Sequence, residues 1–159
     1  MVEIEVANRS GVEVDEQAAV ELARQVLADE GVDGGELGIA FVPPDEIRRL
    51  KREHLGVDEE TDVLSFPIDG REVLPDGVPR QLGDAVLCPQ VTGDSWRGPL
   101  VHGLLHLLGY DHGDAEEEQA MFELQARIVR GWAATTGRGP IRAPLPGTGG
   151  EARDSGGRR

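Results

Sequence analysis

The chain is poor in several residue types, and each scarcity excludes a class of protein. Cys88 is the only cysteine among 159 residues, so no disulfide can form within the chain. No apolar run approaches the ~20 residues of a membrane-spanning helix, so we expect no membrane segment. The chain begins Met1-Val2-Glu3 instead of with a cationic and apolar leader. Secretion is therefore not expected, and the cytoplasm is the predicted compartment.

Positive charge is also scarce. Sixteen Lys and Arg residues stand against thirty Asp and Glu residues, which gives a formal net charge of −14. This excludes a strongly basic nucleic-acid-binding domain of the kind recognised by a high isoelectric point. An anionic substrate must then meet a local feature, because the field of the whole protein repels it.

The length and the distribution of residue types predict one domain with a tail. A domain usually takes roughly 100–200 residues, so this chain is long enough for one domain with a core that needs no disulfides. Residues 138–159 are rich in Gly, Pro and Arg and carry a net charge of +3. We predict a folded domain over residues 1–137 and a disordered tail over residues 138–159.

The hydrophobic pattern predicts an α+β fold in which a small mixed β-sheet is packed against helices. Asp15, Asp45 and Asp114 are the expected helix N-caps. The longest apolar stretch, Leu100–Leu108, predicts a buried central helix. Residues 68–81 are expected to form an exposed loop and residues 92–99 a polar linker. The expected strands are 2–6, 37–42, 63–67 and 85–87, and the expected helices are 16–30, 46–54, 100–108 and 115–130.

The residues with the clearest chemistry lie on and just after that central helix. Three of the four histidines in the chain, His102, His106 and His112, fall within eleven residues. His102 and His106 are four positions apart, so a helix places both on one face. Gly109 can end the helix and turn the chain back, which lets His112 meet the other two. Three imidazoles and one open position form a catalytic zinc site, where the pKa of bound water falls toward neutrality.

The alternative is that the three histidines are unrelated, with two buried and one on a turn. Burying two imidazoles on a helix otherwise rich in leucine requires hydrogen-bond partners or a metal ion. The spacing also matches the histidines and the glycine of the metzincin protease motif, H-E-x-x-H-x-x-G-x-x-H. Gly103 stands where that motif has its catalytic glutamate. The pattern therefore predicts a metal scaffold that lacks the peptidase base.

Three segments resemble one protein family. Residues 102–112, His-Gly-Leu-Leu-His-Leu-Leu-Gly-Tyr-Asp-His, resemble the signature of the YbeY family of bacterial endoribonucleases, the ribosomal RNA maturation factors. Residues 61–67, Thr-Asp-Val-Leu-Ser-Phe-Pro, and residues 82–89, Leu-Gly-Asp-Ala-Val-Leu-Cys-Pro, resemble two strands of the same family. The resemblance covers about residues 1–132.

The resemblance implies one Zn²⁺ ion held by His102, His106 and His112. It also implies a single-strand-specific endoribonuclease that matures the 3′ end of small-subunit ribosomal RNA and takes part in ribosome quality control. The expected partners are ribosomal RNA, the small ribosomal subunit and single-stranded RNA, and neither DNA nor a membrane. Whether water or the neighbouring 2′-hydroxyl attacks the phosphodiester stays open.

The chain departs from the family pattern in two places, and these departures motivate other functions. Leu55 stands where many members carry an arginine, and residues 92–101 are about half the usual length of that segment or less. One alternative is a ribosome-associated binding factor with a structural zinc and little nuclease activity. Another is a metal-dependent hydrolase of a small molecule or peptide, although Gly103 argues against peptidase action.

Further candidate residues have both a functional and a purely structural interpretation. Asp111 is either a carboxylate that orients a ligand imidazole or a solvated turn residue. Asp84 either positions water or an imidazole, or it ends a strand. His54 either contacts phosphate or is an ordinary surface residue. A basic run on the second expected helix is either a docking patch for the RNA backbone or a charged solvent face; it consists of Arg48, Arg49, Lys51 and Arg52.

Overall fold

The computed structural model describes residues 2–59, 61–70, 72–110 and 114–136. The order of the described elements confirms the predicted order, with one short helix added after the fourth strand. The predicted tail at 138–159 lies outside the described residues. The elements are β1 (Val2–Asn8), α1 (Glu16–Asp29), β2 (Gly35–Phe41), α2 (Pro44–Leu55), β3 (Val63–Pro67), β4 (Gln81–Leu87), α3 (Pro89–Thr92), α4 (Arg97–Leu107) and α5 (Ala115–Thr136).

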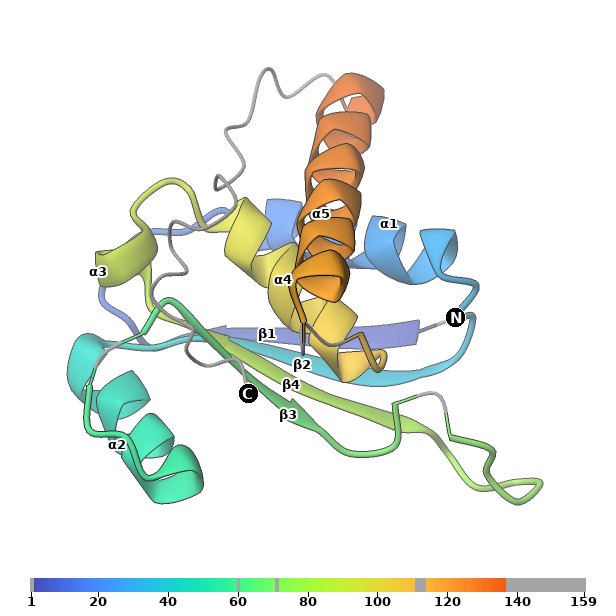
Figure 1. Ribbon diagram of the computed structural model, residues 1–159, viewed down its shortest axis with the longest axis horizontal. Helices are drawn as coiled ribbons and strands as arrows, with labels where there is room; N and C mark the ends of the chain where they lie inside the picture. The colour runs from blue at the N-terminus through green and yellow to red at the C-terminus, as the bar shows by residue number, and fades with distance from the viewer. Residues whose placement is uncertain (1, 60, 71, 111–113, 137–159) are drawn as a thin grey trace.

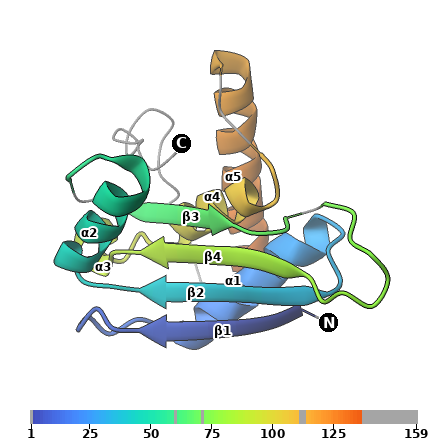
Figure 2. The same cartoon turned by 90° about the horizontal axis from the view of Figure 1, so that it is seen from below.

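The four strands form the small mixed sheet that the sequence predicts, in the order β1-β2-β4-β3. β1, β2 and β4 run parallel, and β3 runs antiparallel to β4 at one edge. Figure 1 shows α1, α4 and α5 stacked on one face of the sheet. Figure 2 shows the opposite face, where α2 covers only one end and most of β1, β2 and β4 is left open.

The main core lies between the sheet and α4, as the apolar pattern of that helix predicts. Leu100, Leu104 and Leu105 are fully buried, and each such side chain contributes about 1.5–3 kcal/mol to the free energy of unfolding. α4 packs on β3 and β4 and is covered by α1 and α5. A smaller cluster under α2 includes Ile47 and Val86. None of the helices among the described residues is both long enough and apolar enough to cross a membrane.

Two of the expected N-caps are confirmed, and one is wrong. The carboxylate of Asp15 accepts a hydrogen bond from the Ala18 amide, and that of Asp114 accepts one from the Glu117 amide. α2 instead begins at Pro44, one residue before Asp45, with no side-chain cap. A proline in the first turn loses no hydrogen bond, because that amide has no partner within the helix.

Three element boundaries also differ from the expected ones. α4 begins at Arg97 instead of Leu100, because Pro99 fits in a first helical turn. β4 begins at Gln81 instead of Ala85. Its first half was not predicted, because Gly83 and Asp84 are residue types that are unfavourable in strands. α5 continues to Thr136 instead of ending near Arg130.

Gly83 marks a close approach between the backbones of β3 and β4, and it yields a stability prediction. Its φ is +133°, and an added Cβ would collide with the Phe66 carbonyl oxygen and lie 3.0 Å from Leu107 Cδ2. Replacing Gly83 by Ala should lower the free energy of unfolding by about 2–4 kcal/mol, measured by urea denaturation. Gly77 also has a positive φ, but an added Cβ there would meet no other atom within 4 Å. Gly77→Ala should therefore lower the free energy of unfolding by only about 1 kcal/mol. Equal losses in the two variants would contradict this account.

Candidate functional site

α4 places two histidines side by side, as the sequence predicts. The ring centroids of His102 and His106 are 4.8 Å apart, with an angle of 75° between the ring planes. Both side chains are partly exposed, whereas most other residues of α4, including its leucines, are buried. A rigid buried helix therefore holds the two imidazoles against each other.

Gly103 explains how α4 comes so close to the sheet. An added Cβ at Gly103 would lie 3.0 Å from Val63 Cγ2 and 3.2 Å from Ser65 Oγ, so this face of the helix rests on β3. The Ser65 hydroxyl donates a 2.9 Å hydrogen bond to the Gly103 carbonyl. A glutamate at this position, as in the metzincin motif, has no room and would point into the sheet. The peptidase base is therefore excluded by packing as well as by sequence.

Gln125 of α5 is a site residue that our sequence reasoning missed. Its side chain is 1% exposed, and its Oε1 lies 3.2 Å from His102 Nδ1. With the amide in this orientation Nδ1 donates the hydrogen bond to Gln125 Oε1, and a neutral His102 ring then carries its lone pair on Nε2. Phe122, also on α5, stacks on the His102 ring at 5.7 Å. A signal was present, because Gln125 falls on the stripe of α5 that is otherwise apolar (Met121, Leu124, Ile128).

The donor set of these residues fits a zinc ion. Ligating histidines usually donate their second ring N–H to an oxygen acceptor, as His102 does to Gln125. The other expected ligand, His112, and the expected orienting carboxylate, Asp111, lie outside the described residues. Within the part of the chain that is described, no three His, Cys, Asp or Glu side chains are grouped closely enough to hold a metal ion.

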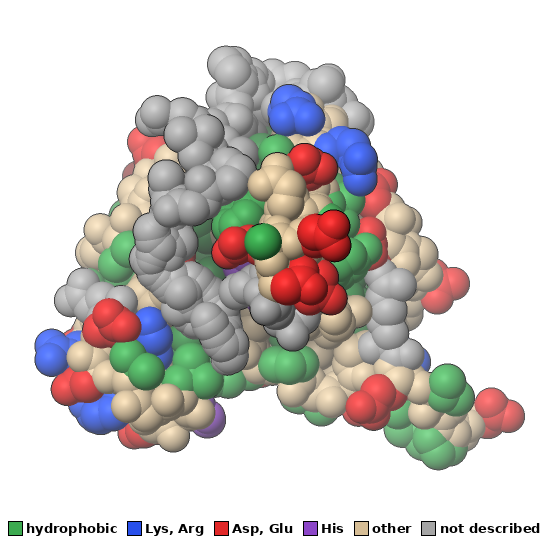
Figure 3. Space-filling view, viewed as in Figure 1, with side chains coloured by type: hydrophobic (Ala, Val, Ile, Leu, Met, Phe, Trp, Pro, Cys, Tyr) green, Lys and Arg blue, Asp and Glu red, His purple; other side chains and the backbone are tan. Residues whose placement is uncertain are grey.

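The surface around the histidines carries negative charge. Figure 3 shows acidic side chains gathered over the first half of α5, the helix that covers α4. Glu116, Glu117 and Glu118 are exposed there, where they also favour the N-terminus of a helix. A polyanion approaching the two imidazoles therefore needs positive charge from elsewhere.

The basic run on α2 is engaged in ion pairs. Arg48 donates a 2.7 Å hydrogen bond to Asp58, and Arg52 lies 3.6 Å from the same carboxylate. The hydrogen bond from Arg48 lowers the pKa of Asp58. Arg49 pairs with Glu53 at 3.8 Å. These three arginine side chains are about half exposed, whereas the Lys51 side chain is only 4% exposed.

Lys51 therefore differs from its neighbours in the run. Its stem is buried and its Nζ lies 3.4 Å from Glu59 Oε1, so it contributes to the packing of α2. Leu55 ends α2 and is 41% exposed. The positive charge available on the surface of α2 is that of the three arginines.

His54 and Asp84 lie near the open face of the sheet. Ala85 faces α4, because an added Cβ at Gly103 would lie 3.7 Å from its Cβ. Strand residues alternate between faces, so Asp84 points away from α4 and does not reach the imidazoles. The His54 ring is exposed and packs edge-on against Phe66 at 4.8 Å. The structure thus separates these two residues from the histidine pair.

Comparisons with known proteins show which family the chain resembles. The family model "Endoribonuclease YbeY" matches residues 4–133. The endoribonuclease YbeY of Salinispora tropica is 41% identical over 155 residues, which cover 85% of this chain and 99% of that protein. The Streptomyces coelicolor protein of the same name is 41% identical over 163 residues, covering 89% and 97% of the two chains.

A solved structure supports the fold. The solution structure of a Thermotoga maritima protein aligns with a TM-score of 0.54 at 24% sequence identity, covering 98% of this chain and 99% of that one. The family match extends over β1 to α5 and includes the helix that pairs His102 with His106. The chain therefore belongs to the YbeY endoribonuclease family.

Proposed function

We propose that the chain is a zinc-dependent, single-strand-specific endoribonuclease. Its proposed role is maturation of the 3′ end of small-subunit ribosomal RNA, together with ribosome quality control, in the cytoplasm. The observation that carries the proposal is the histidine pair of α4, with His102 oriented by the buried amide of Gln125. Membership of a family named for endoribonuclease activity supports it.

His102, His106 and His112 would hold the ion, and Asp111 would orient one of the ligands. A bound zinc ion would supply a Lewis acid that polarises a phosphoryl oxygen and lowers the pKa of a bound water. Gln125 accepts a hydrogen bond from His102 Nδ1, so that His102 would hold the ion through Nε2. The buried leucines of α4 keep both rings in place before substrate binds.

The proposed RNA contacts lie on α2. Arg48, Arg49 and Arg52 would bind backbone phosphates, with Lys51 and His54 at the border of the patch. Each exposed ion pair contributes only about 0–1 kcal/mol to the stability of the fold. Phosphate oxygens can therefore replace Asp58 and Glu53 as partners of the arginines. On a chain of net charge −14, such a patch restricts where RNA can dock.

A ribosome-associated binding factor with a structural zinc is the second candidate. The exposed apolar side chain of Leu55 favours it, because a cation is absent where many family members have one. In that case RNA would be bound without being cut, and zinc removal would unfold the domain.

Replacing His106 by Ala tests the zinc assignment, and the wild type measured beside it separates these two candidates. In the variant, bound zinc should fall from one ion per chain to nearly none, and cleavage of a single-stranded RNA should fall on the order of 10²–10³-fold. The measurements are metal analysis of protein purified without added metal, and cleavage with and without chelator.

His54→Ala is the matched control and should keep its zinc. Full metal content and full activity in His106→Ala would refute the zinc assignment. Absence of cleavage by the wild type, with unfolding on chelation, would favour the binding factor.

Gln125→Met tests whether the buried amide supports the metal site. Methionine has a similar volume, so the fold should persist while the acceptor for His102 is lost. Zinc affinity, measured by competition with a chromophoric chelator, should fall about 10–100-fold. Gln119→Met changes an exposed residue of the same helix and should leave the affinity unchanged. Wild-type zinc affinity in Gln125→Met would show that the amide does not support the site.

Asp58→Asn tests the arginine patch on α2. The variant releases Arg48 and Arg52 from their shared carboxylate, so affinity for a uridine oligomer should rise about two- to fivefold at low salt. The gain should fade as salt is added. Asp33→Asn makes the same charge change at an exposed position between α1 and β2. An equal gain in both variants would mean that net charge alone is responsible.

A further inference from the structure

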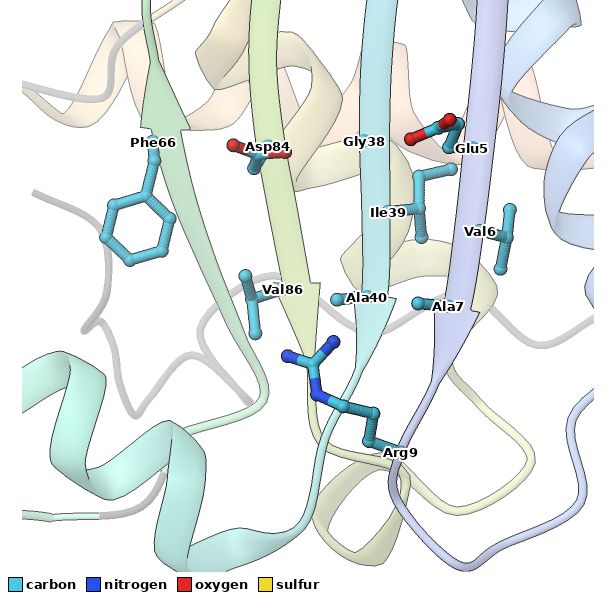
Figure 4. A pocket seen from close by; sticks show the side chains of 10 residues that line it. All are labelled: Glu5, Val6, Ala7, Arg9, Gly38, Ile39, Ala40, Phe66, Asp84 and Val86. Atoms are coloured by element: carbon cyan, nitrogen blue, oxygen red, sulfur yellow. The ribbon is translucent and has the colours of Figure 1, made fainter.

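The open face of the sheet carries a hollow that the zinc proposal does not use. Its volume is about 570 Å³, within the range of roughly 300–1,000 Å³ typical of ligand pockets. Figure 4 shows the Phe66 ring, the carboxylates of Glu5 and Asp84 and the Arg9 guanidinium group around small and apolar residues. The lining residues used below are Glu5, Arg9, Gly38, Phe66 and Asp84.

The Asp84 carboxylate occupies space that is free because the neighbouring residue, Gly38, has no side chain. Gly38 is the register partner of Asp84 on β2, and an added Cβ at Gly38 would collide with Asp84 Oδ1. The carboxylate therefore lies across the backbone of β2. Among the described residues it takes part in no hydrogen bond or ion pair, so both of its oxygens can accept hydrogen bonds from a ligand.

An aromatic ring stands beside this carboxylate. Phe66 of β3 is the direct register partner of Asp84, so both side chains lie on the same face of the sheet. The ring is partly exposed, and the exposed ring of His54 packs against it at 4.8 Å. Aromatic rings in this setting provide a surface on which an unpaired base can stack.

Arg9 supplies the cation of the hollow. Figure 4 shows its guanidinium group turned back over the ends of β2 and β4. It donates a 2.6 Å hydrogen bond to Glu46, and its side chain is 55% exposed. That contact leaves other guanidinium N–H groups for a phosphate, because the group has five donors.

The donor pattern that matches this hollow is that of guanine. A carboxylate accepts hydrogen bonds and donates none, so the ligand must present donors. Guanine carries two adjacent donors, N1–H and the N2 amino group, which suit the two oxygens of one carboxylate. Adenine and cytosine present one amino group beside an acceptor nitrogen, and uracil presents one N–H between two carbonyl groups. The negative charge of Glu5, on the same face, repels phosphate, so a phosphate group without a base is not expected to bind here.

We propose that the hollow binds an unpaired guanine of a single-stranded RNA, with the base on Phe66 and His54, its Watson–Crick edge on Asp84 and a phosphate at Arg9. This rests on the proposed function, because RNA is taken as the substrate. Ser65 faces α4 and the adjacent Phe66 faces the hollow, so edge strand β3 separates the histidine pair from the guanine site. An RNA strand that crosses this edge would be bound through its guanine on one side of β3 and cut at another nucleotide on the other side.

The test compares uridine heptamers whose central nucleotide is guanosine or inosine, which lacks the N2 amino group. Affinity for the full chain is measured by fluorescence anisotropy in the cold, and gels confirm that the oligomers remain intact. The guanosine oligomer should bind about tenfold more tightly, the effect of one hydrogen bond to a charged group. In Asp84→Asn the difference should shrink to within about twofold. Glu5→Gln removes the same charge from the same hollow and should retain the tenfold difference.

Amide NMR shifts locate the contact and identify another occupant if there is one. The guanosine oligomer should shift the amides of Gly38, Phe66 and Asp84. Equal affinity for the two oligomers, or a difference that survives in Asp84→Asn, overturns the proposal. A synthetic peptide of residues 138–159 that shifts these amides when the RNA does not would overturn it in favour of a site for a basic segment.

The outcomes also separate this proposal from the proposed function. RNA cleavage by a chain that shows no guanine preference refutes the guanine site alone. A guanine preference that depends on Asp84, in a zinc-loaded chain that does not cut RNA, supports the guanine site and refutes the nuclease assignment alone.

Discussion

The close contact between α4 and β3 is the constraint on which the rest of the structure depends. Gly103 has no side chain, so the helix can rest directly on the strand, and the Ser65 hydroxyl joins the two through the Gly103 carbonyl. The neighbours of Gly103 on the helix then fill the core, while His102 and His106 stay partly exposed beside this contact. Small side chains at such contacts let two elements approach closely, and the approach fixes the direction of every other residue on the helix.

The alternation of strand residues extends this constraint to the other face of the sheet. Once Ser65 and Ala85 face α4, Phe66 and Asp84 must face away from it. Gly38 adds the space that lets the Asp84 carboxylate lie across β2. One strand pair therefore supports the histidine-bearing helix on one side and a polar, aromatic hollow on the other.

The sequence predicted the elements better than it predicted the site. Apolar periodicity and the caps Asp15 and Asp114 placed most helices correctly, because those signals are local. The start of β4 was missed because Gly83 and Asp84 are unfavourable in isolation and are stabilised only by pairing with β2 and β3. Gln125 was missed because its partner lies 23 positions earlier, on another helix. The pairing of His102 with His106 was predictable from spacing alone, whereas the roles of His112 and Asp111 remain predictions.

The order of the elements along the chain has a consequence for how the protein is made. All four strands are complete at Leu87, ten residues before α4 begins at Arg97. The apolar face of the sheet stays exposed until α4 packs on β3 and β4. Domains generally fold as units, so the strands reach their final arrangement only after the histidine-bearing helix has been made. His102 gains Gln125 as its partner later still, because Gln125 lies on α5, the last described element.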